Sequence, residues 1–308
     1  MKRLTEGRKM FITVLAIFIF YGGFFIIFDD FDRRIWMPLS DTWSWHLLGV
    51  GVLVLIILAF VLHRYAHRMD ERISREQAEK ADQLRRELTQ NIAHELKTPL
   101  ASILGYSETL LNNPDIDPDT RQQFIERTHS QAQRLSSLFQ DIATLNRMDS
   151  APEIIAMDRV NVSVLFSDIV QEIQRAPQNH DMTLRNCLPA SIIVTGNETL
   201  LYSVFRNLIN NSIKYAGDGT SIELTAEEHT TYWQFTYSDT GVGVPPDNLP
   251  HLFERFYRVD KGRSRKLGGS GLGLAIVRNA IQLHGGTITA ESNIPHGLKF
   301  VFTLNKTI

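Results

Sequence analysis

Two uncharged apolar runs, at residues 10–28 and 46–62, dominate the hydrophobic pattern at the start of the chain. Each is close to the ~20 residues with which a helix crosses a bilayer. Trp43 and Trp45 precede the second run, where interfacial aromatic residues commonly lie. We therefore predict two transmembrane helices within residues 1–62. A cleavable signal peptide is the alternative for the first run, although no small-residue cleavage site follows it.

Basic residues indicate how these helices are oriented. Lysine and arginine cluster before the first run and after the second, with only Arg33 and Arg34 between them. The positive-inside rule therefore predicts a membrane-embedded, multi-pass protein with both termini in the cytoplasm. The loop at residues 29–45, on the outer side, is too short to form a core of its own. A membrane or extracytoplasmic accessory protein remains open as a partner for it.

Charged residues with high helix propensity follow the second run, and no Gly or Pro occurs from His63 to Lys97. This pattern predicts one continuous helix that leaves the membrane, and residues 63–81 are expected to be its signalling linker. From Leu84 onward, apolar residues recur mainly at spacings of three and four. Such a stripe is typical of a helix that packs against partners in a bundle.

A second amphipathic helix is predicted after a turn at residues 112–120, which are rich in Asn, Pro and Asp. Its apolar face runs from Phe124 to Leu145, and it is expected to end near Met148. Two helices bury little apolar surface by themselves. The hairpin at residues 82–150 is therefore expected to form a four-helix bundle in a homodimer.

His94 lies in the first helix of this hairpin, within the segment AHELKTPL. It is about 200° of helical arc from Ile92 in the apolar stripe, so its ring is expected to be accessible. Glu95 can hold or accept a ring proton and leave the other nitrogen nucleophilic, and Thr98 lies one turn further on. Pro99 leaves the carbonyl of Glu95 without its helical bond, which favours a local bend. A lone helical histidine is more often structural, so this interpretation requires an electrophile elsewhere in the chain.

The second half of the chain alternates helical and strand patterns from about Val160. Alternating and β-branched segments beside amphipathic ones predict an α/β domain over residues 151–308, with a mixed or largely antiparallel sheet covered by helices. The expected helices are at 163–174 and 198–216, and the expected strands at 221–228, 232–241, 286–292 and 297–304.

Four polar clusters lie within this domain. Asn207, Asn211 and Lys214 recur on one face of a helix, and in SDTGVGVP Asp239 ends a strand before glycines that let a ligand approach the backbone. LFERFYRVD, at residues 252–260, adds two arginines among aromatic residues. GGSGLGLAIV, at residues 268–277, runs from glycines directly into a helix, an arrangement that binds phosphates.

Each cluster alone has a simpler explanation, such as a solvated helix face or an ordinary turn. Their joint order after the histidine-bearing hairpin is far more specific. The segments NIAHELKTPLASILGY, NLINNSIKYA, SDTGVGVP, LFERFYRVD and GGSGLGLAIV are similar to the H, N, first glycine, F and second glycine boxes of two-component sensor histidine kinases.

This resemblance extends from Asp82 to the C-terminus. It implies a HisKA-type dimerisation and phosphoacceptor domain at residues 82–150, then an ATP-binding α/β sandwich of the Bergerat (GHKL) type at 151–308. A bacterial cytoplasmic membrane is the implied location. Nothing in the chain resembles a HAMP, PAS or large periplasmic sensor domain, so the stimulus is not indicated.

The resemblance also implies roles for individual residues. His94 would take the phosphoryl group of ATP and pass it to an aspartate of a cognate response regulator, with Glu95 as its acid/base. Thr98 would orient the water that dephosphorylates the regulator. Asn211 would coordinate Mg²⁺, and Asp239 would accept the adenine amino group. The other residues expected to border the nucleotide are Asn207, Lys214, Tyr215, Gly241, Gly243, Arg255, Arg258, Gly269, Gly271, Leu272 and Gly273.

The resemblance further places a mobile lid at the basic run of residues 261–266, for which a solvated surface loop is the alternative. Because the nucleotide and His94 would lie on different domains, residues 148–159 are expected to act as a hinge. A net charge of -2 gives no electrostatic case for nucleic acid, and the single cysteine, Cys187, excludes an intrachain disulfide.

Two other classes of protein share parts of this pattern. A receptor or scaffold that only binds would keep the apolar runs and the hairpin without needing His94, Asn211 and Asp239 together. An ATPase with the same kind of nucleotide domain would hydrolyse ATP without a phosphohistidine, and the segment around His94 argues against it.

Overall fold

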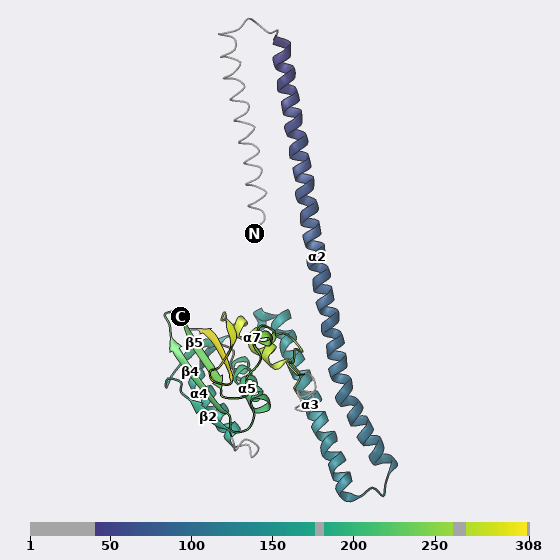
Figure 1. The fold of residues 1–308 in the computed structure, drawn as a ribbon, viewed down its shortest axis with the longest axis vertical. Coiled ribbons are helices and arrows are strands. Elements are labelled where there is room, and N and C mark those ends of the chain that lie inside the picture. Colours follow the sequence, from purple (N-terminus) through teal and green to yellow (C-terminus); the bar gives the residue numbers. More distant parts are fainter. Residues whose placement is uncertain (1–40, 176–181, 261–268, 307–308) are drawn as a thin grey trace. The chain divides into compact units, whose positions relative to one another are not determined.

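The computed structural model describes residues 41–175, 182–260 and 269–306 (Figure 1). The chain divides after Arg86 into two units. The first predicted transmembrane run, at residues 10–28, and the predicted lid, at 261–266, lie outside the described residues.

Helix α2 (Asp41–Asn112) is a single helix of 72 residues, as predicted from the absence of Gly and Pro after the second apolar run. Within it, Gly49–Glu76 is long and apolar enough to cross a membrane. This stretch overlaps the second predicted span. The chain remains helical on both sides of Pro99, whose side chain is buried.

In the second unit, the end of α2 and helix α3 (Pro118–Ser150) form the predicted hairpin, joined by five residues. Asp117 caps α3 by accepting a 3.0 Å hydrogen bond from the backbone N–H of Thr120. Pro118 follows at the first helical position, where its missing N–H has no cost. The sharp turn thus follows from the Asp-Pro pair that ends the loop.

The α/β domain contains a five-stranded mixed sheet in the order β2-β4-β5-β7-β6. Strands β2 and β4 are parallel and the other neighbours are antiparallel. Its strands are β2 (Thr183–Asn186), β4 (Ser221–Glu228), β5 (Tyr232–Asp239), β6 (Ile288–Ser292) and β7 (Leu298–Asn305). The short strands β1 (Asp158–Asn161) and β3 (Ile193–Gly196) form a separate antiparallel pair.

Three helices accompany the sheet: α4 (Val162–Gln174), α5 (Glu198–Tyr215) and α7 (Gly273–Leu283) (Figure 1). Every second residue of β5, from Trp233 to Asp239, is buried, so one face of this strand points into the core. Phe205 of α5 packs against Phe235 of that face and against its neighbour Phe302 on β7, with ring centroids 6.4 and 6.1 Å apart. Asp239, the last residue of the strand, therefore enters the protein beneath α5.

The strands β4 to β7 and the helices α4 and α5 confirm the predicted α/β architecture. Strands β1, β2 and β3 were not predicted, because four residues give too little alternation to distinguish a strand from a loop. The core also includes Leu138, Leu145 and Met148 of α3, which join the hydrophobic cluster of the α/β domain. The hairpin and the α/β domain are thus packed together in this structure.

Candidate functional site

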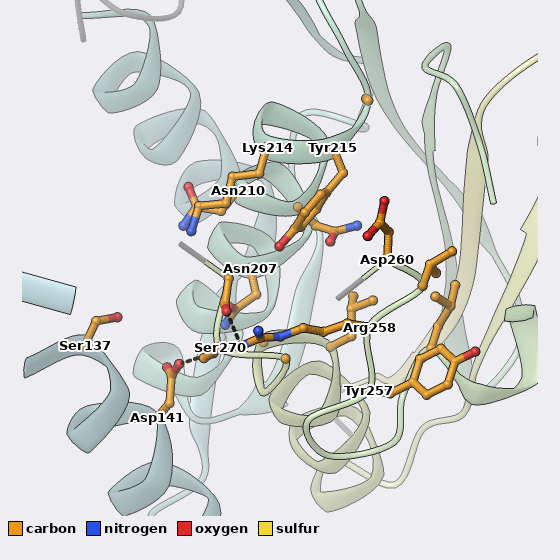
Figure 2. Close-up of a pocket in the computed structure, with 18 of the residues that line it drawn as sticks. Ser137, Asp141, Asn207, Asn210, Lys214, Tyr215, Tyr257, Arg258, Asp260 and Ser270 are labelled. Atoms are coloured by element: carbon orange, nitrogen blue, oxygen red, sulfur yellow. Dashed lines mark hydrogen bonds between the residues drawn. The ribbon is translucent and has the colours of Figure 1, made fainter. Parts of the chain in front are cut away.

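A cavity of about 700 Å³ lies where the four polar clusters of the α/β domain meet the hairpin (Figure 2). It brings together eleven of the sixteen residues predicted to act in catalysis or nucleotide binding, from segments that are far apart in the chain. These are Glu95, Asn207, Asn211, Lys214, Tyr215, Asp239, Gly243, Arg258, Gly269, Gly271 and Gly273.

Asp239 is the buried polar end of the cavity, with only 3% of its surface exposed. Its Oδ2 atom accepts a hydrogen bond from Ser212 (2.7 Å), and its Oδ1 atom accepts from the backbone N–H groups of Gly241 (3.0 Å) and Leu298 (3.1 Å). Three donors from α5, β7 and the loop after β5 therefore fix one carboxylate. Such a carboxylate is suited to accept a further hydrogen bond from a ligand amino group.

Burial in the protein raises the pKa of Tyr237, which lies beneath this carboxylate. The Tyr237 hydroxyl lies 2.9 Å from the Ser212 oxygen and 3.1 Å from the carbonyl of Leu208, so it remains a neutral donor. Tyr237, Ser212 and Asp239 form one buried hydrogen-bonded series. The series orients the carboxylate from below.

Gly241 brings the loop after β5 against the end of α5. A Cβ atom at Gly241 would lie 2.3 to 2.6 Å from atoms of Ala216, including its backbone. The N–H of Val242 bonds to the Ala216 carbonyl at 3.0 Å. Gly241 is therefore needed for close backbone approach and supports the cavity without lining it.

Helix α5 presents five polar side chains to the cavity: Asn207, Asn210, Asn211, Lys214 and Tyr215. The amide nitrogen of Asn207 donates back to Ser203 of its own helix at 2.9 Å, and its Oδ1 atom faces Gly273 at the start of α7. Burial lowers the pKa of Lys214, although the charge of Asp141 opposes this shift. Lys214 is thus a partly desolvated cation next to amide oxygens.

The glycine-rich segment is paired through its backbone with the aromatic segment at residues 252–260. Gly271 has a φ of 73°, and its carbonyl accepts a 2.8 Å hydrogen bond from the N–H of Phe256, which itself has a φ of 63°. Gly271 needs to be glycine because a side chain is strained at this angle and would meet the Phe256 backbone at 2.8 Å. This pairing fixes the entry into α7.

Helix α7 begins at Gly273 without a side-chain cap and without an acidic residue in its first turn. Its first N–H groups are therefore suited to bind an anion, since the helix dipole adds partial positive charge there. The Ser270 hydroxyl accepts from the N–H of Leu272 at 3.2 Å and adds a donor to the same place. These groups fit the phosphates of a nucleotide.

A Mg²⁺ ion in this cavity would have few protein ligands. Over residues 41–175, 182–260 and 269–306, no group of three His, Cys, Asp or Glu side chains could hold a metal ion. Mg²⁺ in nucleotide sites commonly takes only one or two protein ligands and completes its shell with phosphates and water. The oxygen of Asn211, in the cavity wall, fits that kind of site.

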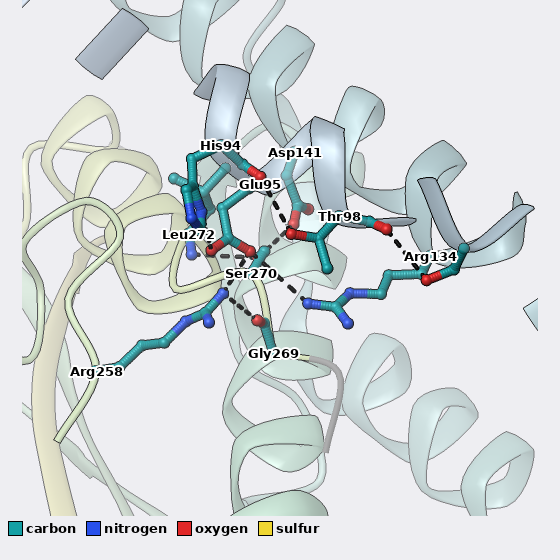
Figure 3. Close-up of polar contacts among 10 residues, drawn as sticks. His94, Glu95, Thr98, Arg134, Asp141, Arg258, Gly269, Ser270 and Leu272 are labelled. Atoms are coloured by element: carbon teal, nitrogen blue, oxygen red, sulfur yellow. Dashed lines mark hydrogen bonds and ion pairs between the residues drawn. The ribbon is translucent and has the colours of Figure 1, made fainter. Parts of the chain in front are cut away.

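His94 lies on the hairpin beside the cavity, with 61% of its side chain exposed, as predicted from its helical position (Figure 3). Its Nδ1 atom is 3.9 Å from Oε1 of Glu95. The other carboxylate oxygen of Glu95 accepts a 2.7 Å hydrogen bond from Arg258 and lies 3.7 Å from Arg134. Thr98 donates a long, 3.4 Å bond to the carbonyl of His94.

Five predicted residues do not line the cavity: His94, Thr98, Gly241, Arg255 and Leu272. Arg255 forms an ion pair with Asp149 at the end of α3, with two contacts of 2.7 and 2.9 Å. Leu272 is a core residue with 1% exposure.

Residues that the sequence did not single out also border the site, among them Arg134, Asp141 and Ser270. Asp141 accepts a 3.1 Å hydrogen bond from Ser270, and burial raises its pKa, which this bond and Lys214 oppose. Asp141 lies between Leu138 and Leu145 in the apolar stripe of α3. A polar residue within that apolar stripe was the one feature of the sequence that pointed to Asp141.

Comparisons with known proteins agree with this geometry. Residues 84–151 match the family described as the His Kinase A (phospho-acceptor) domain, and residues 196–308 match the Histidine kinase-, DNA gyrase B-, and HSP90-like ATPase family. The sensor-like histidine kinase SenX3 of Mycolicibacterium smegmatis is 34% identical over 220 residues, which are 71% of this chain and 57% of SenX3. The chain thus spans little more than half the length of that relative.

Solved structures share the fold. The Acinetobacter baumannii histidine kinase AdeS aligns with a TM-score of 0.57 at 21% identity, over 70% of this chain and 98% of AdeS. Histidine kinase ThkA, solved in complex with the response regulator protein TrrA, aligns with a TM-score of 0.56 at 23% identity, over 72% of this chain and 61% of that one. With both domain families matched in order, the chain belongs to the sensor histidine kinases, in which a HisKA phosphoacceptor domain precedes an ATP-binding domain.

Proposed function

We propose that this protein is an ATP-dependent protein-histidine kinase that phosphorylates His94 and transfers the phosphoryl group to an aspartate of a response regulator. The observation that carries the proposal is the position of Glu95. It is adjacent to the exposed His94 and also lines the cavity that contains Asp239 and the glycine-rich segment. The proposed acid/base and the proposed nucleotide-binding groups would therefore share one site.

The cavity has an end suited to each part of ATP. The fixed carboxylate of Asp239 would accept a hydrogen bond from the adenine amino group. Lys214, Arg258 and the start of α7 would bind the phosphates, because in-line phosphoryl transfer depends mainly on positioning and charge neutralisation. Asn211 would hold Mg²⁺, which supplies positive charge to the phosphate oxygens when it is bound.

His94 is arranged to react through its Nε2 atom. Its Nδ1 atom faces Glu95, which would hold the proton there and leave the Nε2 lone pair free. Nε2 would attack the γ-phosphorus of ATP, forming an N–P bond as the bond to the ADP oxygen breaks. The phosphoryl group would then pass from nitrogen to the carboxylate of the regulator, which restores the neutral imidazole.

We further propose that the protein acts as a homodimer. Several large apolar side chains of the hairpin are exposed in the single chain, among them Leu104 and Phe139. A second copy would cover such a face in a four-helix bundle. A multi-pass arrangement in a bacterial cytoplasmic membrane, with both termini inside, is supported by Gly49–Glu76 and by the pattern of residues 1–40.

Thr98 would serve a phosphatase activity toward the regulator, because its hydroxyl lies one helical turn from His94. In this structure the hydroxyl makes only a long bond to the helix, so it could turn toward a water molecule.

Labelling of the purified protein tests the kinase proposal. After incubation with Mg²⁺ and ATP radiolabelled in the γ-phosphate, the protein should retain acid-labile, alkali-stable label. ATP labelled in the α-phosphate should leave none. Release of inorganic phosphate without any label on the protein would instead indicate an ATPase and would contradict the proposal.

A further inference from the structure

We propose that the docked arrangement of this structure and the binding of nucleotide phosphates exclude each other, because two hairpin carboxylates occupy the phosphate-binding groups of the cavity, so that phosphoryl transfer uses a second arrangement in which His94 meets the bound ATP. The carboxylates are those of Glu95 and Asp141. This inference rests on the proposed function, since it concerns the regulation of the same ATP site.

The first contact joins Glu95 to Arg258 (Figure 3). The guanidinium of Arg258 donates to Oε2 of Glu95 at 2.7 Å and to the carbonyl of Gly269 at 2.5 Å. The side chains of Arg258 and Glu95 are only 7% and 15% exposed. A guanidinium held against the glycine-rich segment is a favourable partner for phosphate oxygens, and here a carboxylate takes that position.

The second contact joins Asp141 to Ser270, immediately before α7 (Figure 2). Ser270 donates to Oδ2 of Asp141 at 3.1 Å and accepts from the N–H of Leu272. The start of an uncapped helix attracts anions, and Lys214 adds a positive charge nearby. Asp141 therefore supplies negative charge where phosphates would bind.

A third contact lies outside the cavity. Arg255 and Asn279 of the α/β domain both bind Asp149 near the end of α3, at 2.7 and 3.2 Å. Neither Asp149 nor its partners line the cavity. Asp149 thus strengthens docking without occupying a phosphate position. A variant of Asp149 therefore tests the effect of docking on phosphate binding without changing the charge inside the cavity.

Exchange of these contacts would couple nucleotide loading to His94. When phosphates take Arg258, the Oε2 atom of Glu95 loses its strongest cationic partner, and the carboxylate can turn toward Nδ1 of His94, now 3.9 Å away. Arg134 belongs to the hairpin and stays near Glu95 after undocking. By linkage, phosphates weaken docking to the same extent that docking weakens phosphate binding.

The experiment compares dissociation constants for the full-length protein in lipid nanodiscs. The probes are the Mg²⁺ complex of a non-hydrolysable ATP analogue and adenosine, which has no phosphate. The variants are Asp141→Asn, Asp141→Ala and Asp149→Asn. Glu126→Gln is the matched control, because this carboxylate also lies on α3 and accepts a hydrogen bond from Gln122 of the same helix.

We expect the analogue to bind roughly ten- to a hundredfold more tightly to the Asp141 and Asp149 variants, the range that one hydrogen bond to a charged group can supply. Adenosine affinity should not change, and Glu126→Gln should resemble the wild type. Unchanged analogue affinity in these variants would overturn the inference, as would tightening by Asp141→Asn alone, which indicates local repulsion. A wild-type protein that binds neither probe would contradict the proposed function itself.

Discussion

The Ser212 hydroxyl donates a 2.7 Å hydrogen bond to the carboxylate of Asp239, and this bond joins the middle of the α/β core to the wall of the cavity. Ser212 has 1% exposure and Asp239 has 3%. The orientation of the carboxylate is therefore fixed before a ligand binds. Because the carboxylate is already ordered, little conformational entropy is lost when a ligand binds to it.

Asp239→Asn should weaken adenosine binding about tenfold or more, because an amide nitrogen replaces one acceptor oxygen. The fold should persist, since the remaining oxygen can still accept from the backbone N–H groups of Gly241 and Leu298. Calorimetric titration with adenosine measures the effect. Ser212→Ala is the control, because it keeps the carboxylate and removes one donor, so its effect should be smaller. Equal affinity in Asp239→Asn and wild type would place adenine elsewhere.

Gly241→Ala and Gly273→Ala should have different effects. A Cβ at Gly241 would collide with the Ala216 backbone, so we expect a loss of ~1–3 kcal/mol in the free energy of unfolding. At Gly273 the nearest atom is Oδ1 of Asn207, at 2.7 Å, and this side chain can turn away. Gly273→Ala should therefore weaken nucleotide binding with less change in stability. Chemical denaturation and nucleotide titration of both variants test this, and equal destabilisation would show that α7 cannot adjust.

His284 should make stability depend on pH. Its ring is buried, with Nδ1 donating to the Ala280 carbonyl (2.6 Å) and Nε2 accepting from the N–H of Asn197 (2.9 Å), which requires the neutral form. Burial lowers the pKa of His284 below its usual 6.5, and the Ala280 bond opposes this only in part.

The unfolded chain therefore binds a proton at His284 more readily than the folded protein does. The contribution of His284 is complete above pH 6.5 and is lost as the pH falls toward its folded pKa, by up to ~1.4 kcal/mol per pH unit. Unfolding free energies at pH 7.5 and 5.5 should differ more in the wild type than in His284→Gln. The same pH dependence in both proteins would contradict this assignment.

Thr98→Ala should leave phosphorylation of His94 largely intact, because alanine favours the helix and the hydroxyl is bonded only weakly to the His94 carbonyl. Dephosphorylation of the regulator should slow by up to the ~10²- to 10⁴-fold typical of one positioned catalytic group. The measurement is the decay of purified phospho-regulator mixed with either protein in the presence of ADP. Equal decay rates would make Thr98 a structural residue or show that the protein lacks phosphatase activity.

The pattern of neighbouring residues predicted the hairpin and the main strands, because these elements depend on local spacing and turn residues. The hairpin follows from apolar spacing and from the Asp-Pro turn at Asp117 and Pro118, and the position of Asp239 follows from the end of an alternating strand. These features depend on residues close together in the sequence. The exposure of His94 was predicted in the same way and is confirmed.

Contacts between distant elements could not be predicted in this way. Asp141 and Asp149 act on Ser270 and Arg255 only because α3 packs against the α/β domain, which no local periodicity specifies. For the same reason Arg255, expected beside the nucleotide, pairs instead with α3 in this arrangement. These residues meet their partners only when the hairpin is docked on the α/β domain, so their contacts can be identified only from the folded structure.

If His94 itself accepts the phosphoryl group of ATP, label from the γ-phosphate should depend on this one histidine. Purified wild-type protein, His94→Gln and the matched variant His129→Gln, whose histidine lies on α3 of the same hairpin, are incubated with Mg²⁺ and γ-labelled ATP. Acid-labile label should appear on the wild type and on His129→Gln and should be absent from His94→Gln, while all three proteins bind ATP equally. Label retained on His94→Gln would show that another residue accepts the phosphoryl group.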